Sequence, residues 1–406
     1  MGKQIQTSAW APRHDAALRA LEGFIPRAGR EYAQTRNYDY GPDARSNVSA
    51  LSPWIRHRIL TEVEVLDAVL AQHDVLDAEK YIQEVFWRGY FKGWLEHRPS
   101  VWSHYRETLH TQLNQIERSG SLASAYDEAV SGRTGITAFD AWAHELVETG
   151  YLHNHARMWF ASIWIFTLKL PWVLGADFFY RHLLDGDPAS NTCSWRWVGG
   201  LHTQGKTYLA RADNIAKFTN GRFNPDPGTL SPDTASAPDG DVPPVRPLQL
   251  PTEEYPTGRI GLLMTEEDCS PLSLALNDAP CSILALNSVT PRSPLPMSKP
   301  VEAFASDAVA IAARAAAQSW QIEARLSEAP DWTQCIEDWV ADQRIDVVLT
   351  ARPPIGPVRN RLMNATRNIS TPIIEWVRPY DRLVWPHSQK GFFGLKKRIP
   401  ELLQAL

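Results

Sequence analysis

The sequence predicts a mixed, two-domain protein in which an all-α domain comes first and an α/β domain with a doubly wound parallel sheet follows. Three observations support this prediction. The 406 residues are more than one ordinary hydrophobic core accommodates. Apolar residues recur at helical spacing in the first half, whereas short apolar runs alternate with helical stretches in the second. A proline-rich stretch lies between the two halves.

Residues 1–220 are expected to form the helical domain. Apolar residues recur at helical spacing over 81–95 and again over 152–170. Ser52, which a proline follows, predicts the start of another helix, with Ser52 as its N-cap and a helical pattern over 54–71. The unpaired backbone N–H groups at such a helix start suit a phosphate group.

Residues 221–257 hold nine of the 30 prolines of the chain and are expected to form an extended linker. Residues 258–406 are expected to form the α/β domain. We expect its strands at 259–265, 281–287, 346–351 and 372–377, and its helices at 301–320, 332–344 and 357–368. No GxGxxG or Walker sequence follows the first strand, so this fold alone assigns no nucleotide to the domain.

The composition narrows the classes of function. The net charge is −5, so any DNA-binding surface would have to be a local basic region. The four cysteines lie far apart without a CxxC pair, which suits reduced thiols in the cytoplasm, and we expect no metal site. The first ten residues contain no apolar signal core, and the most apolar helix, 158–168, is too short to span a bilayer. We therefore expect a cytoplasmic protein.

Four segments carry polar and aromatic residues at spacings that a binding site could use. Glu84, Trp87 and Arg88 share one helical face, and so do Asn154 and Arg157. Taken singly, each segment also fits an ordinary role as a capped helix, an amphipathic helix with a surface ion pair, a buried helix or a turn. The segments are 46–54 (SNVSALSPW), 84–88 (EVFWR), 149–158 (TGYLHNHARM) and 185–197 (DGDPASNTCSWRW).

In this order and at these separations, the four segments resemble the FAD-binding domain of the photolyase/cryptochrome superfamily, over about residues 32–224. The most specific likeness lies in TGYLHNHARM and in DGDPASN with the WRW that follows. The resemblance implies a folded, U-shaped FAD. The residues that would hold this cofactor are Tyr32, Val48, Ser49, Leu51, Ser52, Arg88, Asn154, Arg157, Asp185, Asp187 and Asn191.

Two of these positions would act on the flavin ring itself. The resemblance implies that Arg157 pairs with Asp185 beside the isoalloxazine and that Asn191 faces flavin N5. An amide at this position accepts a hydrogen bond from N5–H without adding a negative charge that would oppose anionic reduced flavin.

The resemblance also implies a pocket for damaged bases of DNA. Glu84 would hydrogen-bond the bases, Trp87 and Trp197 would form the aromatic walls, Met158 the floor, and Arg36 would hold the DNA backbone. Enzymes that extrude a base recover the lost stacking energy through such contacts.

An electron relay to the flavin would run through Trp195 and Trp172. The position of a third relay tryptophan falls near Ser119, so Tyr126 and Trp164 are alternative relay ends. The residues that would carry the chemistry are Glu84, Asn191, Trp195 and Trp172.

The sequence also departs from the family pattern. Ala50 stands where many relatives have arginine or glycine, and Gly89 where many have glutamate. Most relatives place the α/β domain first, whereas here it comes second. This order resembles a bacterial subgroup of inverted-topology photolyases, for which repair of cyclobutane dimers in single-stranded DNA and a C-terminal domain that seals the flavin site are characteristic.

The resemblance therefore implies light-driven repair of cyclobutane pyrimidine dimers in UV-damaged DNA, preferably single-stranded, by electron transfer from excited, fully reduced FAD. Three alternatives stay open: a cryptochrome-like blue-light photoreceptor, a (6-4) photolyase, and a structural relative without flavin. Chemistry of the (6-4) type relies on histidines in the pocket, which His153 alone does not establish. We expect a monomer without an antenna chromophore.

Overall fold

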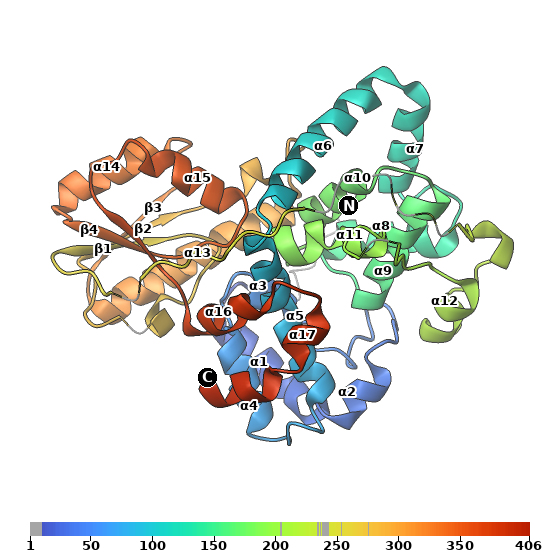
Figure 1. Ribbon diagram of the computed structural model, residues 1–406, viewed down its shortest axis with the longest axis horizontal. Coiled ribbons are helices and arrows are strands. Elements are labelled where there is room, and N and C mark those ends of the chain that lie inside the picture. The colour runs from blue at the N-terminus through green and yellow to red at the C-terminus, as the bar shows by residue number, and fades with distance from the viewer. Residues whose placement is uncertain are drawn as a thin grey trace, which may run out of the picture.

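The computed structural model describes residues 10–203, 205–233, 235, 237, 243–252, 254–274 and 276–406. The start of the chain, from which we expected no signal segment, lies largely outside these residues. Figure 1 shows a helical part and a sheet with its own helices, side by side. In the part of the chain that the structure describes, no helix is both long and apolar enough to cross a bilayer.

The helical part confirms the predicted class, because its described residues form helices and no strand. The expected helix over 81–95 is present. The run over 152–170 bends through a π-helical turn, Ile163–Thr167, and a second such turn spans Pro188–Cys193. The helices are α1 (His14–Phe24), α2 (Arg30–Thr35), α3 (Ser52–Arg56), α4 (Glu62–Leu70), α5 (Glu79–Glu96), α6 (Ser100–Arg118), α7 (Gly120–Val130), α8 (Thr137–Thr149), α9 (Asn154–Ser162), α10 (Trp172–His182), α11 (Trp195–Val198) and α12 (Ala212–Phe218).

The prediction of one helix that starts after an N-cap at Ser52 and continues to residue 71 is wrong in two respects. Leu51 occupies the N-cap position, and Ser52 is already the first helical residue. The helix then ends at Arg56, and α4 starts anew with a capping box in which the Thr61 side chain accepts from Glu64 N. Arg58 lies between the two helices with a left-handed φ of 48°, which helical periodicity could not reveal.

The second part is the predicted doubly wound sheet. Its strands are parallel and lie in the order β3-β2-β1-β4-β5. The four predicted strands are present, and the sequence analysis missed β3, an edge strand with a partly exposed, polar pattern. The strands are β1 (Ile260–Met264), β2 (Ser282–Leu286), β3 (Glu323–Ser327), β4 (Val347–Ala351) and β5 (Ile373–Trp376); the three predicted helices are α13 (Lys299–Trp320), α14 (Trp332–Gln343) and α15 (Pro357–Thr366).

The two faces of the sheet belong to different hydrophobic cores. Leu262 and Met264 point to the face that α13 covers, and this face shares one core with the helical part. Leu263 points the other way, into a smaller core with α14 and α15. The helical part and the sheet are therefore joined by a common core and not only by the chain between them.

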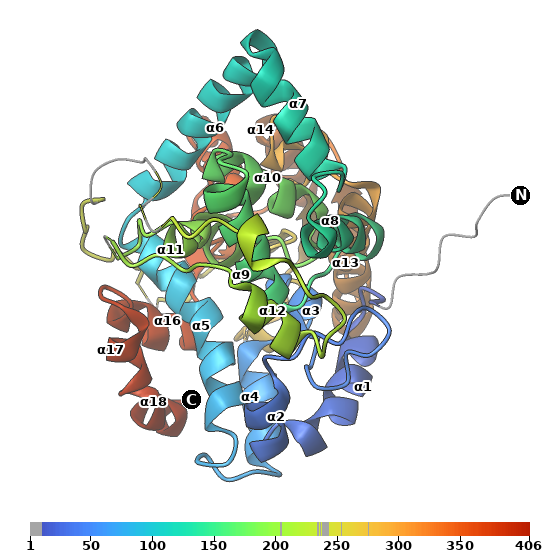
Figure 2. The ribbon, with the colours of Figure 1, turned by 90° about the vertical axis from the view of Figure 1, so that its right-hand side faces the viewer.

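Three helices follow the sheet: α16 (Pro379–Val384), α17 (Phe392–Lys396) and α18 (Ile399–Ala405). α16 and α17 pack back onto α5 of the helical part (Figures 1 and 2), and α18 packs on α16. Two glycines on α5 permit this approach. A Cβ atom at Gly89 would lie 2.8 Å from Tyr380 Oη, and one at Gly93 would lie 2.8 Å from Trp385 Cα. The glycine at position 89, a departure from the family pattern, therefore makes room for the C-terminal helices.

Buried ion pairs join the carboxyl ends of the strands to the helical part. Arg56 donates to both carboxylate oxygens of Glu267, which follows β1, at 2.7 Å each. Arg352, which follows β4, pairs with Glu96 at 3.2 Å. Doubly wound sheets bind ligands in the crevice outside these strand ends. In this protein, Arg56 and Glu96 of the helical part pair with residues at these strand ends.

Candidate functional site

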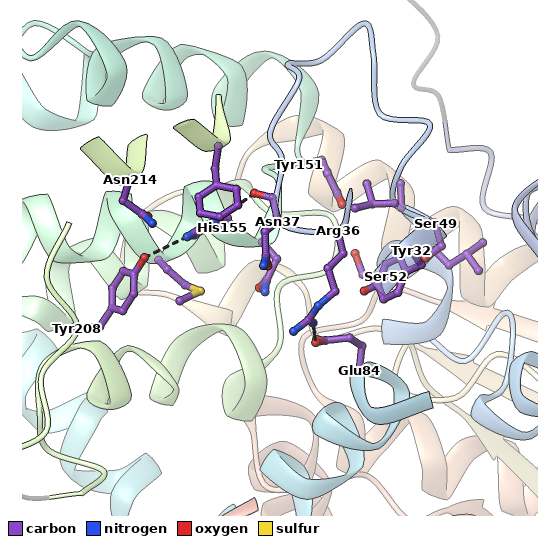
Figure 3. Close-up of a pocket in the computed structure, with 16 residues that line it drawn as sticks. Tyr32, Arg36, Asn37, Ser49, Ser52, Glu84, Tyr151, His155, Tyr208 and Asn214 are labelled. Carbon is purple, nitrogen blue, oxygen red and sulfur yellow. Dashed lines mark hydrogen bonds and ion pairs between the residues drawn. The ribbon is translucent and has the colours of Figure 1, made fainter. Parts of the chain in front are cut away.

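A cavity of about 420 Å³ opens in the helical part, among α2, α3, α5, α9 and α12 (Figure 3). Its volume falls in the range of pockets for small organic ligands. Nine of the predicted site residues meet there. They are Tyr32, Val48, Ser49, Leu51, Ser52 and Asn154 of the predicted cofactor site, and Arg36, Glu84 and Met158 of the predicted lesion site.

An ion pair between Arg36 and Glu84 crosses one side of the cavity (Figure 3). Arg36 stands at the end of α2, and Glu84 lies on α5. Burial raises the pKa of Glu84 above its usual value, and Arg36 offsets this effect only in part. Of the two residues predicted to touch DNA, Arg36 thus lowers the pKa of Glu84 against the effect of burial.

The turn before α3 lines another side of the cavity. Ala50 has a left-handed φ of 49°, and its carbonyl oxygen accepts from Trp10 Nε1 at 2.7 Å. Tyr32 is buried with its ring edge-on to Tyr81, at 5.1 Å between centroids. The hydrogen bond from Trp10 holds the backbone at Ala50, within the turn 48–52 that we predicted to bind phosphate.

A buried polar cluster is linked to the cavity through Ser52. Burial alone would raise the pKa of Asp185, but Arg157 above all, with smaller contributions from Arg88 and from the Ser52 side chain, holds it below its usual value. The predicted pair of Arg157 and Asp185 is present at 2.9 Å. The Asn191 amide satisfies its neighbours when its oxygen accepts from Arg157 Nη1 at 2.6 Å and its nitrogen donates to the Asp185 carbonyl oxygen at 3.0 Å. Arg157 and Asp185 therefore hold Asn191 from two sides.

Asp187 organises the next turn of the chain. One carboxylate oxygen accepts from the backbone N–H groups of Ala189 and Ser190, at 2.9 and 2.7 Å. Burial alone would raise the pKa of Asp187, but Lys92, Arg56 and Arg88 lower it below its usual value. The carboxylate therefore stays ionised.

Several buried polar atoms of this cluster lack a hydrogen-bond partner among the described residues. They include Arg88 Nε and Nη2, Asp185 Oδ1, Asp187 Oδ2 and Lys92 Nζ. Leaving such atoms unpaired costs about 1–3 kcal/mol each, so a polar ligand that reaches them is favoured. Both donors and acceptors are available, which fits the phosphates, hydroxyls and ring amides of FAD.

Lys92 is a member of this cluster that the sequence analysis missed. Its side chain is buried, and burial lowers its pKa, as does the nearby cation Arg58. Lys92 lies four residues after Arg88 on α5 and so shares its helical face. The spacing from Arg88 could therefore have identified Lys92 from the sequence.

Two predicted lesion residues, Trp87 and Trp197, do not line the cavity. Trp87 stacks on Phe392 of α17, with 3.7 Å between ring centroids. Trp197 is 38% exposed and stacks on Tyr208, which does line the cavity. The structure therefore places both tryptophans outside the cavity lining.

The aromatic rings near the cluster form a series. Trp195 and Trp164 lie 6.2 Å apart between centroids, and Trp164 and Tyr126 lie 6.1 Å apart. Trp172 lies 5.9 Å from Tyr105. The series through Trp164 ends at Tyr126, which is partly exposed.

The cavity also contains residues that had no predicted role. His155 contacts Asn37 O at 2.9 Å and Tyr208 Oη at 3.1 Å (Figure 3), and burial lowers its pKa. His155 was visible in the TGYLHNHARM segment, whereas Tyr208 lies outside every motif and reaches the cavity only through the fold. The added lining residues are Asn37, Ala50, Tyr151, His155, Tyr208, Asn214 and Phe218.

Comparison with known proteins extends these findings. The model of a family described as the FAD-binding domain of DNA photolyase matches residues 81–226. A deoxyribodipyrimidine photo-lyase from Synechococcus is 31% identical over 193 residues, which cover 46% of this chain and 38% of the relative. One from Escherichia coli is 28% identical over 211 residues, covering 51% and 43%.

A crystal structure of a bacterial class III photolyase from Agrobacterium tumefaciens is 25% identical, with a TM-score of 0.42 over 52% of this chain and 43% of its own. The matches thus cover about two fifths of the length of these curated relatives.

The Arg36–Glu84 pair yields a prediction. In Arg36→Gln, the pKa of Glu84 should rise further, because the cation that opposes burial is lost. An acid whose pKa is raised in the folded state contributes stability that is lost as the pH rises from its unfolded value through its folded value. The pH range over which this stability is lost should therefore extend to higher pH in the variant. Titration of ¹³C-labelled glutamate carboxyls by NMR measures the shift.

Arg45→Gln is the matched control, because Arg45 pairs with another partly desolvated carboxylate, Glu145, at 2.7 Å. This variant should leave the pKa of Glu84 unchanged. A Glu84 pKa that stays constant or falls in Arg36→Gln would contradict the electrostatic account.

Proposed function

Because the helical part of this chain belongs to the photolyase/cryptochrome superfamily, we propose that the protein is a DNA photolyase that splits cyclobutane pyrimidine dimers in UV-damaged DNA. The observation that carries this proposal is the adjacency of two sets of side chains. Arg36, Glu84 and Met158 line a cavity, and Ser52 links that cavity to the cluster of Asp185 with Arg157. In this proposal, the lesion site and the flavin site are therefore neighbours.

The cofactor-binding part of the proposal rests on the buried cluster. Residues 48–52 would hold the phosphates, Arg88 and Asn154 the folded cofactor, and Asp187 the adenosine side. Asn191, which Arg157 and Asp185 orient, would present an uncharged amide to N5. When bound, reduced FAD would supply the electron that opens the cyclobutane ring on illumination.

The lesion-binding part rests on Glu84. Burial raises its pKa and so makes protonation easier. The ionised carboxylate would accept a hydrogen bond from a base N–H, and the protonated form would donate one to a base carbonyl. Arg36 would exchange its contact with Glu84 for a DNA phosphate. Met158 would support the bases from below, and Trp197, beside the cavity residue Tyr208, would reach them from the rim.

The (6-4) alternative receives weaker support. Among the described residues that line the cavity, His155 is the one histidine. Two contacts hold its ring, and its lowered pKa keeps it neutral near pH 7. A neutral imidazole is a poor proton donor, so the cavity fits dimer splitting better than a reaction that requires a histidine acid.

The expected absence of an antenna chromophore rests on the filled strand ends. Glu267 and Arg352 occupy the crevice where a doubly wound sheet would bind a second chromophore, and both are paired with the helical part. The preference for single-stranded DNA rests on the net charge of −5, because few phosphate contacts suffice for a short strand. The monomeric state and the cytoplasmic location belong to the same proposal.

The direct test is light-dependent repair. The FAD-loaded, reduced protein should restore an oligonucleotide with one thymine cyclobutane dimer under blue light, faster in single-stranded than in duplex form, and should leave a (6-4) lesion intact. Glu84→Ala should weaken binding of the dimer about tenfold while FAD is retained. Glu148→Ala, an exposed site on α8, is the control. No repair by the reduced wild-type protein would overturn the assignment and favour a photoreceptor.

The aromatic series predicts the route of photoreduction. Trp164→Phe should slow light-driven reduction of bound FAD in the presence of a thiol, because it breaks the series from Trp195 to Tyr126. Flavin absorbance measures the rate. Trp142→Phe, equally buried and stacked on Trp159, should be without effect. If Trp172→Phe alone slows the reaction, the relay runs through Trp172 as first predicted from the resemblance.

The contact between the two parts predicts FAD retention. Arg56 donates to the Gly186 carbonyl oxygen at 2.6 Å and lies 3.8 Å from Asp187, while Glu267 holds its other nitrogens. Glu267→Gln should release Arg56 and weaken FAD binding about tenfold, or about 1.4 kcal/mol. The flavin-to-protein ratio after gel filtration measures the loss.

Glu266→Gln is the matched control. Glu266 is equally buried but pairs with Arg292 inside the α/β part, at 3.4 Å. The variant should lose comparable stability and keep its FAD. Equal retention by both variants would show that Arg56 does not position the flavin turn.

A further inference from the structure

The C-terminal segment 388–398 (SQKGFFGLKKR) differs in charge from the rest of the chain. It contains four cationic residues and no acidic one, whereas the whole protein has a net charge of −5. A local basic stretch on a net acidic protein is a candidate contact for an anionic polymer. The cationic residues are Lys390, Lys396, Lys397 and Arg398.

The fold places α17, within this segment, beside α5 (Figure 2). Phe392 is buried and stacks on Trp87, with centroids 3.7 Å apart and rings inclined by 13°. Lys396 pairs with Glu79 at 3.2 Å. The segment is therefore fixed at two points on α5, and Glu84 lies between these points in the sequence.

The next residue exposes an aromatic ring on the surface. Phe393 is 76% exposed, and of the large apolar side chains that the structure describes only Leu76 is more exposed. Burial of Phe392 anchors the helix, so the ring of Phe393 is held on the surface at low conformational cost. Proteins that bind single strands combine such aromatic platforms with nearby cations.

Two cations beside Phe393 are available to a ligand. Lys390 and Lys397 are exposed, and within the described part of the chain neither forms an ion pair. Lys396 and Arg398 have acidic partners, Glu79 and Glu401. The exposed ring is thus flanked on both sides in the sequence by an unpaired ammonium group.

We propose that segment 388–398 binds the DNA strand that flanks the lesion, with Phe393 stacked on a neighbouring base and Lys390 and Lys397 on its phosphates. This inference rests on the proposed function, which places the lesion at Glu84, three residues before Trp87 on α5. It assigns the C-terminal helices a role in substrate binding in addition to their packing on α5. The contact does not depend on base sequence, since every base offers a face for stacking.

The test is binding in the dark of a fluorescein-labelled single-stranded oligonucleotide with one thymine cyclobutane dimer, followed by anisotropy at several salt concentrations. Phe393→Ala should raise Kd about tenfold without changing the salt dependence, because stacking releases no counterions. The double variant Lys390→Gln with Lys397→Gln should reduce the slope of log K against log salt by about 1.4, or about 0.7 per cation.

Matched controls lie at exposed positions of α13, of α15 and at the residue after α15 in the α/β part. Met363→Ala removes another exposed apolar side chain, and Arg314→Gln with Arg367→Gln removes two exposed cations. Neither should change Kd or the salt slope. Circular dichroism and bound FAD should be unchanged in all variants, because the altered side chains are exposed.

The outcomes separate the two proposals. Wild-type affinity and slope in the segment variants, with repair by the wild-type protein intact, would overturn the segment's role and leave the photolyase assignment standing. A wild-type protein that neither binds nor repairs the dimer would overturn both.

Discussion

The arrangement of the molecule depends on one buried arginine. The Arg56 guanidinium is fully buried, and it can stay charged there only because Glu267, Asp187 and the Gly186 carbonyl surround it. Removing one partner of such a pair leaves an uncompensated charge, which costs about 3–5 kcal/mol. One of these partners comes from the α/β part and the others from the turn behind the cavity. Arg56 therefore connects the proposed flavin-binding turn directly to the α/β part.

This constraint explains why the order of the domains can be reversed. A parallel sheet exposes a ligand-binding crevice at its carboxyl edge. Here that edge faces the helical part, and the acidic residues Glu267 and Asp268 after β1 pair with Arg56 and Arg58. Because the docking uses the ends of strands, it does not matter to the interface whether the sheet precedes or follows the helices in the chain. The linker needs only to reach the start of β1.

The features that could be predicted from the sequence are those that depend on local patterns of residues. Buried strands such as β1 and β4 follow from short apolar runs, and the Arg157–Asp185 pair follows from motif resemblance. The break at Arg58 could not be predicted, because its left-handed backbone accompanies ion pairs with Asp381 and Asp268 more than 200 residues away. The cavity residue Tyr208 and the packing of α16 and α17 on α5 were missed for the same reason. Their positions are set by long-range contacts and leave no local periodic signal.

Helix α5 links these observations, because its faces serve different partners. Glu84 lies at the cavity, Arg88 near the carboxylates of the buried cluster, and Gly89 and Gly93 under the C-terminal helices. Eighteen residues of helix thus connect the proposed lesion site, the proposed flavin site and the second domain. A helix is stiff over this length, since each turn is held by backbone hydrogen bonds. The C-terminal helices consequently fix where α5 lies, and α5 fixes how far Glu84 stands from the cluster around Asn191.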